Sequence, residues 1–425
     1  MSDKNMNIDE RRKYLGLMQP RYRDTDRQTK GGLLDEMEAI TGLDRKTLIR
    51  LMRGSLERQV RQRERGKKYG VAVEAVVKVV YESTDRICAE RLQPNLVWLA
   101  THLAQHGELE LRDDVRQLLG EISVPTLERM LEHVRQDEPR LRRLKPRPGN
   151  RMLKDIPMLR LSWAITEPGH CETDLVHHGG SHPVGEYAYT LQMIDVATGW
   201  SDRRAVLGRS YLVMEDAFCY MLARHPFRIV EIHPDNGSEF LSHHMLRFWG
   251  EIVQGVKLSR SRPFHKNDNP RVEQKNSSLV RAYLGDIRLD NVVQVVALNR
   301  IYDKAWIHYN FFQPVMHLSG KEVIESANGA TRIKRIYDDA STPFDRLCQT
   351  EAILPAHREM LEAMRDSINP RRLLQDIYDA LEQLCQLPGA TPGVSENVFH
   401  TLSRYQEKGE DDIPDFVFNR TPIRK

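Results

Sequence analysis

The decisive stretch of this sequence is Ile229-Val-Glu-Ile-His-Pro-Asp-Asn-Gly-Ser-Glu-Phe240. Its first four residues are mostly apolar and predict a strand, and Asp235 follows at the point where that strand ends. The ends of strands are where an α/β sheet presents ligands, and Asn236-Gly237 supplies a tight turn. The stretch therefore predicts an α/β sheet with a functional carboxylate at its edge.

Two further acidic residues accompany Asp235. Asp174 lies within the strand-like run Cys171-Glu-Thr-Asp-Leu-Val176, where a charge is costly unless it is paired or bound to a metal ion. Glu273 begins a helix-like run after the turn Asn267-Asp-Asn-Pro270. Three carboxylates that converge from two strands and a helix suit a pair of hard divalent ions. Such a pair can clamp both the attacking and the leaving oxygen of a phosphoryl displacement.

The order of these acidic residues resembles that of the retroviral-integrase superfamily of DDE transposases. Asp235 follows Asp174 by 61 residues and Glu273 follows Asp235 by 38, separations close to those of the superfamily. Two further segments are similar to one bacterial group of insertion-sequence transposases with an integrase core: Arg260-Ser-Arg-Pro-Phe-His-Lys-Asn-Asp-Asn269 and Asn310-Phe-Phe-Gln-Pro314. The resemblance is dense over about residues 160–320.

The resemblance implies a ribonuclease-H-like catalytic core over residues 158–320. It implies that Asp174, Asp235 and Glu273 are both the catalytic and the metal-binding residues, with two Mg²⁺ or Mn²⁺ ions per active site. The implied activity is DNA 3′-end cleavage followed by strand transfer. The sequence contains neither a P-loop nor a GxSxG elbow, so no nucleotide cofactor is expected.

Two residues are predicted to support the three carboxylates from outside the metal-binding shell. Glu172 shares a strand face with one of them, because side chains alternate along a strand, and Asn236 directly follows another. Asp195 is instead predicted to close a hairpin turn. The histidine pairs 177–178 and 243–244 are predicted to form hydrogen bonds rather than bind zinc, since no cysteines at matching spacing accompany them.

Residues 30–53 predict a helix, a turn and a second helix that Asp44 caps. The apolar stripe predicted for the first helix comprises Leu33, Leu34, Met37 and Ile40. The second helix would present outward four residues suited to reading a DNA groove, namely Arg45, Lys46, Thr47 and Arg50. A plain helical hairpin is the alternative.

A second helical DNA-binding module is predicted for residues 70–138, with a last helix that starts at Ser123. Its earlier helices are predicted near 72–83, 94–106 and 113–121. Thr126 and Arg129 on the last helix are predicted to face DNA. The resemblance adds predicted DNA contacts next to and along the glutamate helix, at Lys266, Lys275 and Arg281.

The chain as a whole is predicted to be multidomain, with N-terminal all-α helix-turn-helix modules, an α/β catalytic domain and a small mixed or helical C-terminal region. The predicted segments are a module with basic linker at 1–69, the second module at 70–138, a basic Pro-rich linker at 139–157, the core at 158–320, the C-terminal region at 321–387 and a partly disordered tail at 388–425. Core strands are predicted near 170–177, 187–196, 200–207, 227–234 and 256–261, and core helices near 210–225, 242–254, 268–284 and 291–309. A short strand is predicted at 333–337 and helix over 350–387.

The 425 residues carry a net charge of only +3, but basic residues are concentrated in two places. Residues 41–70 hold ten Lys or Arg against three acids, and residues 139–154 hold seven without an acid. Such blocks suit contacts with phosphates, and solvated linkers are the alternative. No apolar run is long enough to span a bilayer, and the five scattered cysteines fit reduced thiols. These features predict a cytoplasmic protein that joins the nucleoid when bound to DNA.

The sequence therefore predicts a transposase that binds the terminal inverted repeats of a bacterial insertion sequence. Its partners would be double-stranded DNA, both element ends and target, and further copies of itself in a dimer or larger assembly. Neither a membrane nor a nucleotide is expected as a partner. Two alternatives remain, a catalytically silent DNA-binding regulator and a ribonuclease-H-like nuclease that cuts without joining.

Overall fold

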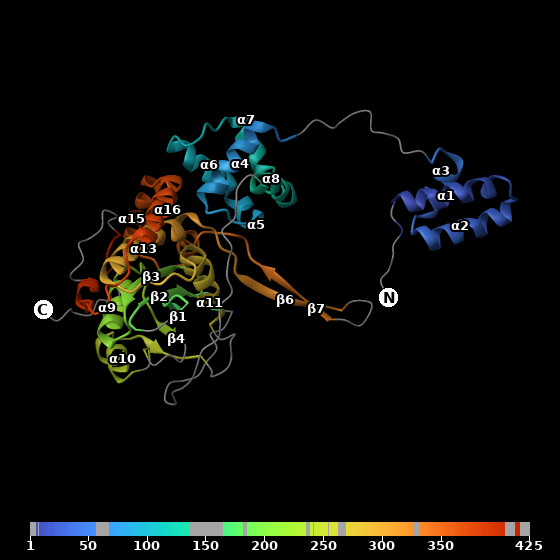
Figure 1. Ribbon diagram of the computed structural model, residues 1–425. Helices are drawn as coiled ribbons and strands as arrows, with labels where there is room; N and C mark the ends of the chain where they lie inside the picture. Colours follow the sequence, from blue (N-terminus) through green and yellow to red (C-terminus); the bar gives the residue numbers. More distant parts are fainter. Residues whose placement is uncertain are drawn as a thin grey trace. The chain divides into compact units, whose positions relative to one another are not determined.

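The computed structural model of the protein describes residues 6, 8–56, 68–136, 165–181, 185–234, 239–240, 242–253, 255–261, 269–325, 331–403 and 413–416. The chain forms two compact units, Met1–Lys68 and Tyr69–Lys425 (Figure 1). Among the described residues, no helix combines the length and the apolar character that crossing a bilayer requires.

The described part of the first unit folds into helices α1 (Ile8–Arg23), α2 (Arg27–Thr41) and α3 (Arg45–Arg53). Its core comprises Leu15, Met18, Tyr22, Leu33, Leu34, Met37, Leu48 and Met52. The predicted cap at Asp44 is confirmed, because its carboxylate accepts a hydrogen bond from the Thr47 N–H. Ile40 was wrongly assigned to the apolar stripe and is 43% exposed. At 100° per residue, Thr41 takes the inward position and Ile40 falls at the margin of the stripe.

The second unit begins with helices α4 (Val71–Ser83), α5 (Ala89–Leu92), α6 (Leu96–Gln105), α7 (Asp113–Gly120) and α8 (Val124–Gln136). These helices enclose an apolar cluster of their own, which includes Val77, Val80, Leu92, Leu99 and Leu119. Side-chain hydrogen bonds also join them to later segments: Arg91 Nε to Pro314 O (2.5 Å), Asn95 Nδ2 to Ala340 O (2.8 Å) and His102 Nε2 to Ile368 O (2.9 Å). The helical part therefore contacts the C-terminal region directly.

A mixed five-stranded sheet lies at the centre of the second unit (Figure 1). Its strands are β1 (His170–His177), β2 (Ala188–Asp195), β3 (Ser201–Leu207), β4 (Glu231–Pro234) and β5 (Lys257–Leu258). Their order is β3-β2-β1-β4-β5, with β2 antiparallel to both β1 and β3, and with β4 and β5 parallel to β1. The predicted mixed α/β class is confirmed. The first three strands match the prediction within one residue at either end, whereas the last two are shorter than predicted.

Different helices cover the two faces of this sheet. On β3, Arg203 points to one face and donates to the Leu279 carbonyl of η3 (Asn276–Arg281), the π-helical continuation of α11 (Pro270–Lys275). Its neighbour Arg204 points to the other face, where its guanidinium lies 3.9 Å from the ring centroid of Tyr220 on α9 (Tyr211–Ala223). Because side chains alternate along a strand, α11 and η3 lie on one face and α9 on the other.

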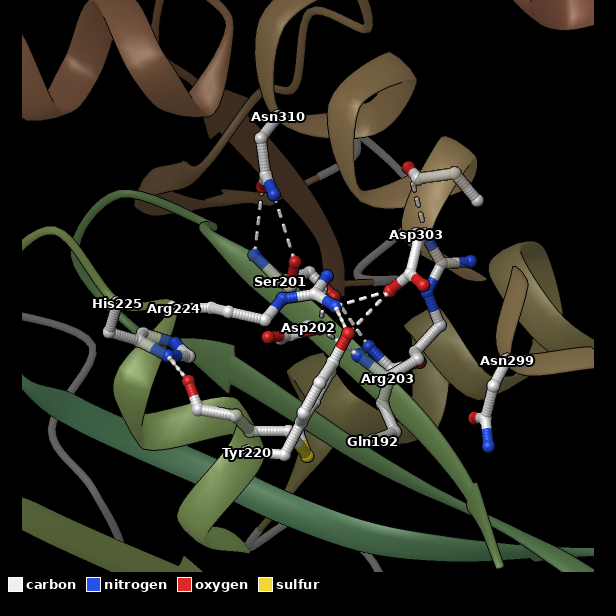
Figure 2. Close-up of polar contacts among 12 residues, drawn as sticks. Gln192, Ser201, Asp202, Arg203, Tyr220, Arg224, His225, Asn299, Asp303 and Asn310 are labelled. Carbon is white, nitrogen blue, oxygen red and sulfur yellow. Dashed lines mark hydrogen bonds and ion pairs between the residues drawn. The ribbon is translucent and has the colours of Figure 1, made fainter. Parts of the chain in front are cut away.

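The long helix α13 (Val292–Phe312) runs along the free edge of β3. The Asn299 carboxamide accepts from the Ala205 N–H (2.8 Å) and donates to its carbonyl (3.0 Å). Asn310 does the same for Ser201, with both distances at 3.0 Å (Figure 2). These two side chains satisfy backbone groups that an edge strand would otherwise expose to a second chain.

A buried ionic network joins β3, α9 and α13 (Figure 2). Arg224 is ion-paired with Asp202 at 3.2 Å and with Asp303, and it donates to the Tyr220 hydroxyl at 2.8 Å. Burial raises the pKa of Asp202 to about 6, although Arg224 acts in the opposite direction. Burial also opposes the charge of Arg224, but Asp202 and Asp303 raise its pKa above the ordinary range.

The C-terminal region combines the hairpin β6 (Leu318–Glu325) and β7 (Thr331–Tyr337) with helices α14 (Pro343–Cys348), α15 (Pro355–Ser367) and α16 (Pro370–Gln386). The segment predicted as helical over 350–387 is mostly helical, and it forms two helices, α15 and α16. Pro355 and Pro370 each begin a new helix, because proline lacks the N–H that a continuing helix needs. Within the predicted tail, η4 (Val398–Thr401) is helical and the Ser403 N–H donates to Asp216 at 2.8 Å.

Candidate active site

Asp174 lies in the middle of β1, on the face that α11 and η3 cover. One carboxylate oxygen accepts from the Leu175 N–H at 2.8 Å, and the other accepts from Asn276 Nδ2 at 2.6 Å. The side chain is half-buried and belongs to a cross-strand row with Gln192 of β2 and Arg203 of β3. The two hydrogen bonds fix the orientation of both carboxylate oxygens.

Glu172, two residues earlier on the same face of β1, is fully buried. Its carboxylate accepts from the backbone N–H groups of Arg271 and Val272, both at 2.9 Å, and from the Arg271 guanidinium at 3.2 Å. Burial raises the pKa of Glu172, and Arg271 is the strongest opposing influence. The carboxylate thus caps the first turn of α11, where unsatisfied N–H groups and the helix dipole favour negative charge.

Glu273 follows Val272 on α11 and is exposed, whereas Val272 is buried. Glu172 accepts a hydrogen bond from the Val272 N–H, directly before Glu273. Asp174 accepts one from the side chain of Asn276, three residues after Glu273. Residues three apart share one side of a helix, so Glu273 and Asn276 lie on the same side as β1. Two of the three predicted carboxylates are therefore described: Asp174 lies on β1, and Glu273 lies on α11, the helix that packs against β1.

The third predicted carboxylate, Asp235, lies outside the described residues, as do Asn236 and Lys266. The strand that leads to Asp235 is described. β4 runs parallel to β1 and ends at Pro234, whose register partner is Thr173, the residue next to Asp174.

Carboxylate oxygens are the ligands that Mg²⁺ prefers, so Asp174 and Glu273 provide a donor set of the right chemistry. Within the part of the chain that the structure describes, no group of three or more His, Cys, Asp or Glu side chains lies close enough to hold a metal ion.

Asn276 was not among the predicted site residues. The sequence contained one signal for it, the spacing of three residues after Glu273. Its second amide atom, Oδ1, is buried without a hydrogen-bond partner among the described residues. The side chain both orients Asp174 and keeps an unused acceptor beside it.

The two remaining predicted DNA contacts on this helix differ in their surroundings. Lys275 is half-buried, with Nζ 4.8 Å from the ring centroid of Tyr309. Burial, then Arg91 and Arg203, lower the pKa of Lys275 to about 7. Arg281 is ion-paired with Asp286 at 3.3 Å.

The predicted DNA contacts of the helical parts lie on helix surfaces. On α3, Lys46 and Arg50 are exposed, Arg45 is ion-paired with Asp35, and Thr47 bonds to the cap residue of its own helix. On α8, Arg129 is exposed and donates to the Pro125 carbonyl (3.1 Å) and to Thr126 Oγ1 (3.3 Å).

Two polar residues that were predicted to be structural have that role. Asp195 accepts from the N–H groups of Gly169 (2.7 Å) and Thr198 (2.8 Å), and so closes the turn after β2. His178 Nε2 bonds to Thr190 Oγ1 at 2.7 Å, and its burial lowers its pKa to about 3.

The fold and this arrangement define a mixed α/β protein in which two carboxylates of a central strand hold the start of one helix. The chain is 32% identical over 318 residues to the uncharacterized protein y4rM of Sinorhizobium fredii, which covers 75% of this chain and 89% of the relative. The chain belongs to the family of that protein. No family model matches it. Among solved structures it is similar to the catalytic core domain of BIV integrase, at 16% identity over 33% of this chain and 83% of that chain, with a TM-score of 0.24.

Proposed function

We propose that the protein is a DDE-type transposase of a bacterial insertion sequence, which cuts DNA 3′ ends and transfers them to a target. One observation carries the proposal. The helix that bears Glu273 is held across Asp174 at two points, by Glu172 and by Asn276. Such attachment fixes a helix against a strand, which a site requires when carboxylates from these two distant segments bind the same charged ligand. The mixed sheet is compatible with a ribonuclease-H-like core.

In this proposal Asp174, Asp235 and Glu273 hold two Mg²⁺ or Mn²⁺ ions. When bound, the ions would supply a Lewis acid for both the entering and the leaving oxygen of the phosphodiester. The other residues keep the ligands in place. Asn276 fixes the Asp174 carboxylate through its 2.6 Å hydrogen bond, and Glu172 fixes the start of α11. Asn236 directly follows Asp235 in the chain and is proposed as a further support.

The proposed partners are the double-stranded DNA of the element ends and of the target, together with further copies of the chain that pair the two ends. Exposed Lys46 supports end binding, because the N-terminal part of a groove-reading helix carries such residues, and exposed Arg50 adds a basic side chain to the same helix. Arg45, Thr47, Thr126, Arg129, Lys266, Lys275 and Arg281 complete the proposed DNA contacts. The proposed location is the cytoplasm, on the nucleoid when DNA is bound.

The test is a cleavage and joining assay with purified full-length protein, Mn²⁺, labelled DNA that flanks its own gene and a supercoiled target plasmid. We expect metal-dependent nicking and a joined product. Asp174→Asn and Glu273→Gln should abolish both and retain specific binding to the end. Glu251→Gln is the matched control, because Glu251 is exposed on η2 (Phe248–Ile252) and pairs only with Arg247 among the described residues.

The alternatives give different products. Binding to the end without cutting, in the presence of either metal, would identify a DNA-binding regulator. Metal-dependent cutting that never yields a joined product would identify a nuclease. Cutting that survives both substitutions would disprove the assignment of the carboxylates.

A further inference from the structure

The Tyr309 hydroxyl, on α13, is a polar group whose burial the proposed chemistry does not explain. The residue is 2% exposed, and its hydroxyl has no hydrogen-bond partner within the described part of the chain. A buried donor without a partner is costly, so native structures rarely keep one without a ligand or a function. Its apolar neighbours Leu279 and Val315 pack against the ring and provide no acceptor side chain.

Basic side chains from three separate helices surround this tyrosine. Lys275 of α11 places Nζ 4.8 Å from the ring centroid. Arg91 of α5 donates to the Pro314 carbonyl at 2.5 Å, and Arg346 of α14 donates to the adjacent Val315 carbonyl at 2.9 Å. Since Val315 touches Tyr309, the three cations converge on one place. Each of the three side chains is half-buried rather than fully enclosed.

These cations are only partly neutralised. Arg346 is ion-paired with Asp338 at 2.7 Å. Neither Arg91 nor Lys275 forms an ion pair with any described residue. Partly buried positive charges without a carboxylate partner favour an anion. A hydroxyl donor beside them matches the oxygens of a phosphate group, which accept several charge-assisted hydrogen bonds.

We propose that Arg91, Lys275 and the Tyr309 hydroxyl form a binding site for a phosphate group. This inference rests on the proposed function, in which the natural source of the phosphate is the DNA backbone. Lys275 follows Glu273 by two residues, about 200° around the helix, so the held phosphate lies on another side of α11 from the carboxylates. The site would thereby fix a DNA strand relative to α11.

The first experiment measures the thermal unfolding midpoint of metal-free full-length protein with inorganic phosphate or chloride at equal ionic strength. Phosphate should raise the midpoint of the wild type by mass action. Tyr309→Phe should weaken phosphate binding roughly fivefold and leave the midpoint in chloride unchanged or higher, because it removes an unsatisfied donor. Lys275→Gln should weaken phosphate binding about tenfold.

Tyr302→Phe is the matched control. The Tyr302 hydroxyl is hydrogen-bonded to Thr190 Oγ1 at 2.6 Å, so its removal should lower the midpoint in chloride and leave the phosphate effect intact. The proposal is overturned if phosphate does not raise the wild-type midpoint, or if Tyr309→Phe and Lys275→Gln respond to phosphate as the wild type does.

The second experiment identifies the source of the phosphate, through the salt dependence of binding to a DNA duplex without metal. If the site holds a backbone phosphate, Lys275→Gln should reduce the slope of log affinity against log salt by about one. An unchanged slope with intact phosphate stabilisation would assign the site to a free phosphate anion. Neither readout requires cleavage, so failure of the transposase assay would leave this result interpretable.

Discussion

Glu172 and Asp202 are both fully buried carboxylates of the same sheet, but their partners differ. Asp202 lies under α9 and meets Arg224, which is itself held by Asp303. Glu172 lies under α11 and is met mainly by backbone N–H groups. The first carboxylate belongs to a closed ionic network between packed elements. The second carboxylate positions α11, in which the exposed Glu273 directly follows Val272.

This difference separates one side of the sheet, where charges are paired within the fold, from the other side, where carboxylates are placed to bind a ligand. The β3–α9–α13 side has paired charges and edge groups that Asn299 and Asn310 satisfy. The β1–α11 side has a half-buried Asp174 on the strand and an exposed Glu273 on the helix. Charges that a protein needs for structure are compensated internally, whereas charges that await a ligand are only held in place.

The largest expected effect comes from breaking the closed network with Arg224→Met. Asp202 and Asp303 would lose their common cation, and an uncompensated buried charge destabilises by about 3–5 kcal/mol. Chemical denaturation should show this loss in the free energy of unfolding. Arg247→Met, which breaks an exposed pair on the surface of α10 (His243–Arg247), should change the free energy of unfolding far less, because solvent screens exposed pairs. Equal losses of unfolding free energy in the two variants would show that the buried network contributes no more than an exposed ion pair.

The second prediction concerns pH and involves a buried histidine on each side. Burial lowers the pKa of His225, beside the network, to about 4 and that of His178, at the end of β1, to about 3. An unfolded histidine titrates near 6.5, so the unfolded chain binds these protons first. Their contribution to stability is complete above pH 6.5 and is lost as the pH falls toward 4.

Each histidine should contribute a slope of about 1.4 kcal/mol per pH unit within that window. The contribution of Asp202 to the pH dependence of stability has the opposite sign, because its raised pKa of about 6 favours the folded state as the pH falls. The measurement is therefore a difference, the free energy of unfolding of the wild type minus that of His225→Asn or His178→Asn, from pH 4 to 7. Parallel curves for wild type and variant would contradict the prediction.

The sequence predicted the first three strands almost to the residue, because clear turns such as Asp195-Val-Ala-Thr-Gly199 mark where strands end. It could have indicated Asn276 from helical spacing alone. It could not predict the contact between Glu172 and Arg271, which are 99 residues apart in the chain. The edge contacts of Asn299 were equally hidden, since they depend on where α13 runs once the chain has folded.

The smallest expected effect on stability, and the one that separates the two sides most sharply, comes from Glu172. Glu172→Gln keeps an acceptor for the N–H groups of Arg271 and Val272 but loses the charge that faces the Arg271 guanidinium. We expect a loss of about 1–2 kcal/mol, because the two N–H groups keep an acceptor. Glu172→Ala removes the cap as well and should lose more.

The activity of these variants decides whether Glu172 acts through Glu273. If it positions the helix, Glu172→Ala should raise the Mn²⁺ concentration for half-maximal cleavage about tenfold or more, as loss of a supporting hydrogen bond does at metal sites. Glu172→Gln should restore most of that affinity, because it restores the cap. A purely structural role would lower the fraction of folded protein and leave the metal dependence of the remainder unchanged. Arg224→Met should show that second pattern, since its network touches neither Asp174 nor α11.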